Sequence, residues 1–338
     1  MSKRILFLAE RMAMGFGVAV VIENLAEELA RRGHCVDVGC INWDRNQGRN
    51  FQVHVLSANA ASVHKLASDL QSEYVIAHTS PFFEVLPQMP GPYERWVWEH
   101  GDPTPELFPF DGTERKRIAE SKRINVYPNV DRVIAISEFI REDIGWSDAD
   151  IVYNGCDHLR PARPQSSPDK QKLRVGTLMR LGEGEAFYKG NQLFMDLVEY
   201  CRRRNDYIEF YLMGRGSEED AKPFEELGVI TYTNATDQER AQYLADLDIF
   251  VSLSLWEGFN LPLVEAMVSG TFAIAFDTGA HPEVTPGVVS SLMEMGSLIL
   301  SLNNNRPVLN ARSEAARKYI SDKYRWSISV DSMLNLMK

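Results

Sequence analysis

Two glutamates eight positions apart form the most informative pattern in this sequence of 338 residues. They begin and end the run Glu257-Gly258-Phe259-Asn260-Leu261-Pro262-Leu263-Val264-Glu265. Proline is favoured in the first turn of a helix, where its missing N–H is not needed, so a helix is predicted to begin at about Leu261. The unpaired N–H groups and the positive dipole end of that helix could bind a phosphate or another anion. One carboxylate would then precede the anion site, and the other would lie about one turn beyond it.

Other polar residues follow predicted strands, where ligands of parallel sheets bind. Arg180 and Lys189 come after the strand predicted at Leu173–Leu178, and together they could neutralise a diphosphate. His100 directly follows the strand predicted at Trp96–Glu99. A lone histidine at a strand end is more often structural than catalytic, so its position alone does not decide its role. Gly17 lies in a loop after the first predicted strand, either as a simple turn residue or where the backbone approaches a phosphate.

Short β-branched and aromatic runs alternate with helical patterns along the whole chain, which predicts α/β units with parallel sheets. Strands are predicted at Ile5–Leu8, Val36–Cys40, Tyr74–Ala77, Trp96–Glu99, Arg132–Ile136, Leu173–Leu178, Ile208–Met213, Val229–Thr233, Ile249–Leu253 and Phe272–Phe276. The proline-rich segment His158–Lys172 between the two series is predicted to be a linker. The simplest architecture is therefore two Rossmann-like, doubly wound domains that face each other across a cleft.

Composition excludes several classes of protein. The formal net charge of -11 argues against broad nucleic-acid binding, which requires a basic surface. The four cysteines show neither a paired spacing nor the spacing of metal ligands, so they are interpreted as reduced thiols. No apolar stretch is long enough to cross a bilayer, and the first apolar run is too short for a signal peptide. A cytoplasmic protein is expected.

One cluster of basic residues could contact an anionic lipid surface or an anionic acceptor. It comprises Arg115, Lys116, Arg117, Lys122 and Arg123, with Glu114 and Glu120 interleaved. The interleaved glutamates make an ordinary solvated helix face an equally simple interpretation. Contact with a membrane surface is therefore the less favoured reading of the cluster.

The run from Glu257 to Glu265 resembles the E-x7-E signature of the retaining nucleotide-sugar glycosyltransferases of family 4, which have the two-domain GT-B fold. The resemblance extends to Arg180, to Lys189 with its following glycine, and to His100. It implies an acceptor-side domain over residues 1–160 and a nucleotide-sugar donor domain over residues 161–326. A terminal helix at residues 327–338 is expected to pack back on the first domain.

The resemblance also implies a role for each matching residue. His100 and Glu257 are expected in the catalytic site, and Glu265 is expected to bind the ribose of the donor. The diphosphate is expected at Gly17, Arg180, Lys189 and Leu261, and the donor sugar at Gly258, Phe259 and Asn260. No metal and no cofactor is expected beyond the UDP- or GDP-sugar substrate. The acceptor remains open among small molecules, glycans and lipid-linked sugars.

Three alternatives remain in view. A GT-B epimerase or hydrolase of nucleotide sugars would share the scaffold without transferring a sugar to an acceptor. A non-catalytic protein that binds sugar nucleotides would be expected to lack one of the site residues. A dehydrogenase has one point in its favour, because Asp37 lies about where a ribose-binding acid should be, but it is disfavoured by Val20, which replaces the third glycine of the dinucleotide motif.

Overall fold

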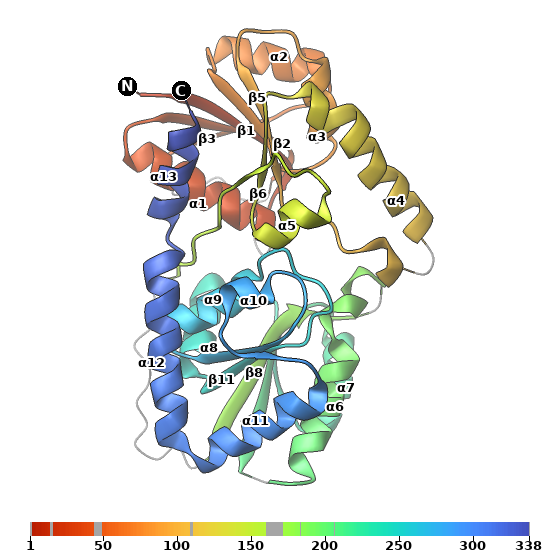
Figure 1. Ribbon diagram of the computed structural model, residues 1–338, viewed down its shortest axis with the longest axis vertical. Helices are drawn as coiled ribbons and strands as arrows, with labels where there is room; N and C mark the ends of the chain where they lie inside the picture. Colours follow the sequence, from red (N-terminus) through yellow and green to blue (C-terminus); the bar gives the residue numbers. More distant parts are fainter. Residues whose placement is uncertain are drawn as a thin grey trace. The chain divides into compact units, whose positions relative to one another are not determined.

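The computed structural model describes residues 2–13, 16–43, 49–108, 111–159, 172–182, 184–205 and 207–337. The chain divides into two compact units, one formed by Met1–Gly155 with Trp326–Lys338 and the other by Cys156–Arg325. Each unit contains one parallel sheet covered by helices (Figure 1). The two Rossmann-like domains expected from the sequence are thus confirmed.

The first unit is built on a seven-stranded sheet with the order β3-β2-β1-β4-β5-β6-β7. Ile5 of β1 lies opposite Val36 of β2 and Tyr74 of β4, and all three are buried. Near-continuous apolar runs are typical of central parallel strands, which are covered on both faces. The strands are β1 (Arg4–Met12), β2 (Cys35–Trp43), β3 (Gln52–Val55), β4 (Tyr74–Ala77), β5 (Glu94–Glu99), β6 (Arg132–Ala135) and β7 (Asp150–Ile151).

The helices of the first unit connect these strands. α1 buries an apolar face that includes Val21, Ile22, Leu25 and Leu29, as its sequence pattern requires. The helices are α1 (Gly17–Arg31), α2 (Ala60–Asp69), α3 (Phe82–Val85), η1 (Leu86–Gln88), η2 (Pro105–Leu107), α4 (Gly112–Ser121), the π-helix η3 (Lys122–Val126), η4 (Tyr127–Asn129), α5 (Glu138–Asp143) and α13 (Trp326–Leu336).

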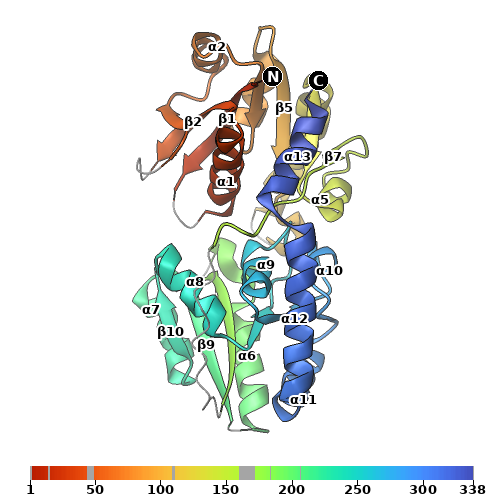
Figure 2. The same ribbon diagram turned by 90° about the vertical axis from the view of Figure 1, so that its left-hand side faces the viewer.

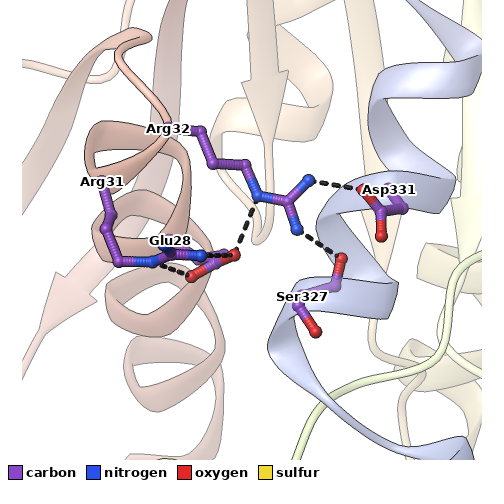
Figure 3. A network of polar contacts seen from close by, with 5 residues as sticks. All are labelled: Glu28, Arg31, Arg32, Ser327 and Asp331. Carbon is purple, nitrogen blue, oxygen red and sulfur yellow. Dashed lines mark hydrogen bonds and ion pairs between the residues drawn. The ribbon is translucent and has the colours of Figure 1, made fainter.

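Helix α13 returns the end of the chain to the first unit, where it lies beside α1 (Figure 2). Arg32, just after α1, joins the two helices (Figure 3). Its guanidinium donates to Glu28 at 2.8 Å, to Asp331 at 2.5 Å and to the carbonyl of Ser327 at 2.8 Å. A single side chain thus links α1 to the returning helix through three hydrogen bonds.

The second unit has a six-stranded sheet with the order β10-β9-β8-β11-β12-β13. Strand order reverses between β8 and β11, because the chain moves outward to β10 before β11 pairs with β8. The loops that follow β8 and β11 therefore meet at the point where α/β sheets bind ligands. The strands are β8 (Leu173–Arg180), β9 (Ile208–Arg215), β10 (Ile230–Thr233), β11 (Ile249–Ser252), β12 (Phe272–Phe276) and β13 (Val288–Val289).

The helices of the second unit pack around this sheet, and α12 contacts both α9 and β12. They are η5 (Gly184–Lys189), α6 (Asn191–Arg202), α7 (Glu218–Glu226), α8 (Asp237–Asp246), α9 (Leu261–Val268), α10 (His281–Val284), α11 (Leu292–Asn304) and α12 (Arg306–Lys323). Helix α9 begins at Leu261, as predicted from the proline that follows it.

All ten predicted strands are present, and three short strands, β3, β7 and β13, were not predicted. β7 and β13 have only two residues, too few to produce a periodic signal, and β3 alternates apolar with polar residues and so lacks a continuous apolar run. Most of the predicted linker, residues 160–171, lies outside the described residues.

The basic cluster on α4 and η3 forms local ion pairs. Arg115 pairs with Asp111, Lys116 with Glu106, and Arg117 with Glu114. Lys122 is buried, so the sequence-based grouping of Lys122 with a solvated or lipid-facing surface was wrong. No helix in the described ranges is both long and apolar enough to span a bilayer.

Replacing Arg32 by alanine is expected to lower the free energy of unfolding by about 1 to 2 kcal/mol, because hydrogen bonds of a partly buried charge are lost. Amide hydrogen exchange in α13 should accelerate, and urea denaturation should give the stability change. Arg31→Ala is the matched control, because among the described residues Arg31 pairs only with Glu28, and its side chain is 67% exposed. Equal effects of the two substitutions would contradict the proposed link.

Candidate functional site

Two loops meet at the reversal of strand order in the second unit. Gly190, the N-cap residue between η5 and α6, adopts a left-handed conformation with φ of 83°. A Cβ atom there would lie 2.4 Å from the carbonyl oxygen of Leu253, so only glycine allows this approach. The carbonyl of Tyr188 also accepts a hydrogen bond from the N–H of Leu255 at 2.8 Å. The loop after β8 is thereby fixed against the loop after β11.

A third loop, after β12, holds the segment that contains Glu257. The N–H of Ala280 donates to the carbonyl of Glu257 at 2.9 Å, and the hydroxyl of Thr278 donates to the carbonyl of Leu255 at 2.8 Å. Gly279 has φ of 57°, and a Cβ atom there would lie 2.4 Å from the carbonyl oxygen of Glu257. The backbone on which Glu257 stands is therefore fixed from two sides.

Lys189 and Glu257 form an ion pair at this junction, with Nζ 2.8 Å from Oε1. Their side chains are 21% and 13% exposed, so the pair is reachable from solvent but partly desolvated. Burial alone would lower the pKa of Lys189, but the carboxylate of Glu257, helped by the hydroxyl of Tyr188, raises it above its ordinary value. Lys189 is therefore charged at neutral pH and can attract an anion.

The start of α9 is held by a buried polar network. Asn260 caps the helix from a left-handed conformation, with φ of 68°, and its side-chain oxygen accepts from the N–H of Leu263. Its Nδ2 donates to the hydroxyl of Ser252 and to Nε2 of His281, each at 2.8 Å. Nδ1 of His281 then donates to the carbonyl of Phe276 at 2.9 Å. Burial lowers the pKa of His281, in agreement with a neutral ring.

These contacts limit how the predicted sugar-binding residues could act. The amide of Asn260 is already bonded inside the unit, and the ring of Phe259 is buried, edge-to-face against Tyr324 at 5.3 Å. A ligand would therefore meet the backbone of the segment from Gly258 to Leu261 rather than these side chains. Leu261 is the first residue of α9, where the positive end of the helix dipole lies.

Glu265, one turn into α9, is fully buried yet charged. Oε1 lies 2.9 Å from Nε2 of His158 and 3.6 Å from the guanidinium of Arg240 on α8. Burial alone would raise the pKa of Glu265, but Arg240 and His158 outweigh it and lower the pKa below its ordinary value. Neither carboxylate oxygen accepts an aligned hydrogen bond from a described residue. The ion pair with His158 is thus close in distance but poor in hydrogen-bond geometry.

Arg180 ends β8 and is exposed, and its carbonyl accepts from Nδ2 of Asn191 at 3.1 Å. The end of β8 is thereby tied to the first residue of α6. Arg180, Lys189, Glu257, Leu261 and Glu265 all belong to the second unit. The contact expected between Arg180 and a diphosphate stays a prediction.

Two of the predicted site residues, His100 and Gly17, belong to the first unit. His100 follows β5, and Nε2 of its ring lies 3.0 Å from Nδ1 of His78, which follows β4. Burial and, to a lesser extent, the charge of Lys122 lower the pKa of His100 to about 3, while Asp102 acts in the opposite direction. Gly17 is the first residue of α1, and no atom lies within 4 Å of where its Cβ would be.

A buried ion network supports the turn after β5. Nζ of Lys122 lies 3.1 Å from Glu99 and 2.8 Å from Asp102, and the hydroxyl of Tyr127 donates to Glu99 at 2.7 Å. The two carboxylates raise the pKa of Lys122 despite its burial. This network fixes the residues on both sides of His100.

Several residues of the site were not predicted from the sequence. His158 lies in the predicted linker, and Arg240 lies on a helix with many polar residues, so no spacing marked either of them. His78 directly follows a predicted strand, and His281 lies shortly after another. Their position after strands was the only signal in the sequence that could have marked them as site residues. Asp37, the acid that favoured a dehydrogenase, lies inside β2 and pairs with His54 at 2.7 Å, so it is not at a strand end.

Comparison with known families agrees with this arrangement. Residues 16–160 match a family model described as Glycosyltransferase Family 4, and residues 174–303 match one described as Glycosyl transferases group 1. The two matches fall in the first and second units, respectively, apart from the few residues after Gly155.

Two characterised relatives are similar in sequence. A poly(ribitol-phosphate) alpha-N-acetylglucosaminyltransferase of Staphylococcus aureus is 25% identical over 242 residues, which cover 67% of this chain and 48% of the relative. A phosphatidyl-myo-inositol mannosyltransferase of Mycobacterium leprae is 28% identical over 223 residues, which cover 60% of this chain and 58% of the relative. The chain thus matches about half of the length of these relatives.

Solved structures share the fold over almost the whole chain. A sucrose-phosphate synthase from Thermosynechococcus elongatus superposes with a TM-score of 0.82 at 14% identity, covering 99% of this chain and 98% of that one. The Anabaena protein Alr3699/HepE in complex with UDP-glucose gives a TM-score of 0.77 at 18% identity, covering 99% of both chains. This likeness shows the GT-B fold. The two family matches show that the chain belongs to the family 4-like glycosyltransferases.

Proposed function

We propose that the protein is a retaining glycosyltransferase that moves a hexose-type sugar from a nucleoside diphosphate donor, UDP- or GDP-linked, to an acceptor. Breaking the bond between the anomeric carbon and the diphosphate leaves negative charge on the phosphate and positive character on the sugar. Lys189, Arg180 and the start of α9 at Leu261 would stabilise the leaving group. Glu257 and the backbone from Gly258 to Asn260 would hold the sugar.

The proposed donor site is supported chiefly by the environment of the Glu265 carboxylate. It is 0% exposed and ionised, yet it lacks an aligned hydrogen bond from any described residue. A buried carboxylate ordinarily accepts several hydrogen bonds, so this one has unused capacity. The two hydroxyls of a ribose ring supply a matching pair of donors. His158, which covers Oε1, would have to shift to admit them.

Similar proteins support parts of the reaction. The name of the Staphylococcus aureus relative specifies an alpha product, as retention gives from the common alpha-linked UDP-sugars, and the Anabaena structure contains UDP-glucose. The two sequence relatives act on a polymer and on a phosphatidylinositol lipid, according to their names. We therefore propose a glycan or lipid-linked acceptor for this chain, with a small molecule as the alternative. His100, in the first unit, is proposed to contact the transferred sugar.

Binding of UDP- and GDP-sugars to the wild-type protein tests the donor site. Saturable binding is expected, and both Glu265→Gln and Lys189→Ala should weaken it by about tenfold or more, because each removes a charge-assisted contact. Isothermal titration calorimetry without added metal gives the dissociation constants. Lys222→Ala, an exposed change on α7, is the matched control and should leave binding unchanged.

The products then separate the possible reactions. Sugar transfer to an added acceptor, with the anomeric configuration retained, supports the transferase. Free sugar or an altered nucleotide sugar as the main product, whatever acceptor is supplied, would instead support a hydrolase or an epimerase. Absence of binding to every nucleotide sugar would contradict the donor site itself.

Arg240→Met is expected to make donor binding depend on pH. Without the guanidinium, burial should raise the pKa of Glu265, so that donor affinity falls as the pH is lowered, whereas wild-type affinity should stay constant above the ordinary carboxyl range. The free energy of unfolding should drop by about 3 kcal/mol at neutral pH. This loss should shrink as the pH falls, because protonation removes the unpaired buried charge.

Calorimetry and urea denaturation over a pH series provide both measurements. Arg202→Met is the control, because Arg202 also donates a hydrogen bond, to the carbonyl of Gly228, but lies on α6. A constant stability loss in Arg240→Met at every pH would show that Glu265 does not titrate in the variant.

Sugar transfer is expected to need no divalent metal. Lys189, Arg180 and the N-terminus of α9 supply positive charge where a metal would otherwise neutralise the diphosphate. Initial rates should therefore be equal in excess EDTA and in added magnesium. A rate that vanishes in EDTA and returns with a divalent cation would contradict this expectation.

A further inference from the structure

Two histidines contact each other at the carboxyl ends of β4 and β5 in the first unit. Nδ1 of His78 and Nε2 of His100 are 3.0 Å apart, and the ring centroids are 5.3 Å apart. His78 is only 1% exposed, whereas His100 is partly exposed. His78 thus contacts His100 from inside the unit and leaves Nδ1 as the other polar atom of the His100 ring.

Both rings are neutral. Burial is the main cause that lowers the pKa of His78, with a smaller effect from His100, and burial also dominates at His100. The charged groups that act on His100 are Lys122 and Asp102, in opposite directions. A neutral imidazole carries one N–H and one bare nitrogen, so one ring of the pair donates the hydrogen bond and the other accepts it.

The surroundings of His78 decide which ring donates. Nε2 of His78 is buried and has no hydrogen-bond partner in the part of the chain that the structure describes. A buried N–H without a partner is rarer than a buried acceptor without one, so the proton belongs on Nδ1 of His78. Nδ1 of His78 therefore donates to Nε2 of His100. Because Nε2 of His100 accepts, the single proton of that ring is on its Nδ1.

Packing holds the donating ring in place. The His78 ring is stacked on Trp98, with a centroid distance of 5.2 Å and an interplanar angle of 18°, and meets the edge of Phe7 at 5.1 Å. The backbone N–H of His78 also donates to the carbonyl of Leu8 at 2.8 Å. A ring packed against two aromatic rings and held at its backbone keeps one orientation, and so it presents the same nitrogen to His100.

We propose that His78 is a positioning residue that fixes His100 as the Nδ1–H tautomer. The ring nitrogen of His100 outside the pair is then a hydrogen-bond donor, suited to an oxygen atom of the transferred sugar. The lone pair of that nitrogen belongs to the aromatic ring and cannot remove a proton, so the nitrogen does not act as a general base. The identity of the ligand rests on the proposed function, whereas the tautomer does not.

Long-range proton–nitrogen NMR correlation of the nitrogen-15-labelled full chain, without ligand, measures the tautomer directly. Between about pH 6 and 8, His100 is expected to show a protonated Nδ1 and a bare Nε2, with no titration. The signals that disappear in the spectrum of His100→Asn identify His100 among the seven histidines. A proton on Nε2 of His100, or titration of the ring in this range, would overturn the proposal.

Variants of His78 separate positioning from packing. His78→Asp offers only an acceptor, so it should move the His100 proton to Nε2 and lower kcat/KM by about tenfold, the equivalent of one hydrogen bond. His78→Asn keeps an N–H near the place of Nδ1, so the His100 tautomer should be retained and the loss should be smaller.

His64→Asn is the control, because His64 also pairs through Nδ1, with the hydroxyl of Tyr93 at 2.9 Å, and lies on α2 of the same unit. Equal losses of turnover in His78→Asp and His78→Asn, with an unchanged tautomer, would reduce His78 to a packing role. If no nucleotide sugar is turned over by any protein, the proposed function fails, while the spectrum of the wild type still decides the tautomer.

Discussion

The reversal of strand order beside β8 is the constraint on which the donor side depends. It brings the loops after β8 and β11 together, although they are far apart in sequence, and so places Lys189 beside Glu257. The loop after β12 completes the support through Gly279, whose missing side chain allows contact with the Glu257 backbone. Backbone contacts between these three loops therefore position the polar residues of the site.

The candidate site residues of the two units differ in charge. In the second unit, burial is offset by opposite charge, as Arg240 and His158 keep Glu265 ionised. In the first unit, burial prevails at His78 and His100, which stay neutral even though the ion network of Lys122 lies beside them. This difference fits the chemistry proposed for each unit, because a diphosphate and a ribose diol favour charged groups, whereas a neutral sugar needs only a directional donor.

The sequence predicted the fold well because parallel sheets have a strong local signal. Every strand of four or more residues except β3 was visible as a short apolar run, and the start of α9 followed from Pro262. The site was predicted only as far as the family motif extends. His158 and Arg240 were missed because their importance comes from a buried carboxylate on another element, and no spacing along the chain encodes such a contact.

His281 is a second histidine whose tautomer follows from its buried hydrogen bonds, as proposed for His100. Nε2 of His281 accepts from Asn260, so the proton must be on Nδ1, where it meets the carbonyl of Phe276. Every polar atom of that ring is satisfied within its own unit. The His78 and His100 pair has the same donor-to-acceptor order but ends at a ring nitrogen for which no described residue is the partner. The hydrogen bonds of His281 are therefore complete, and their role is structural. The His78 and His100 pair still lacks an acceptor for the N–H at Nδ1 of His100, as expected of a group that binds a ligand oxygen.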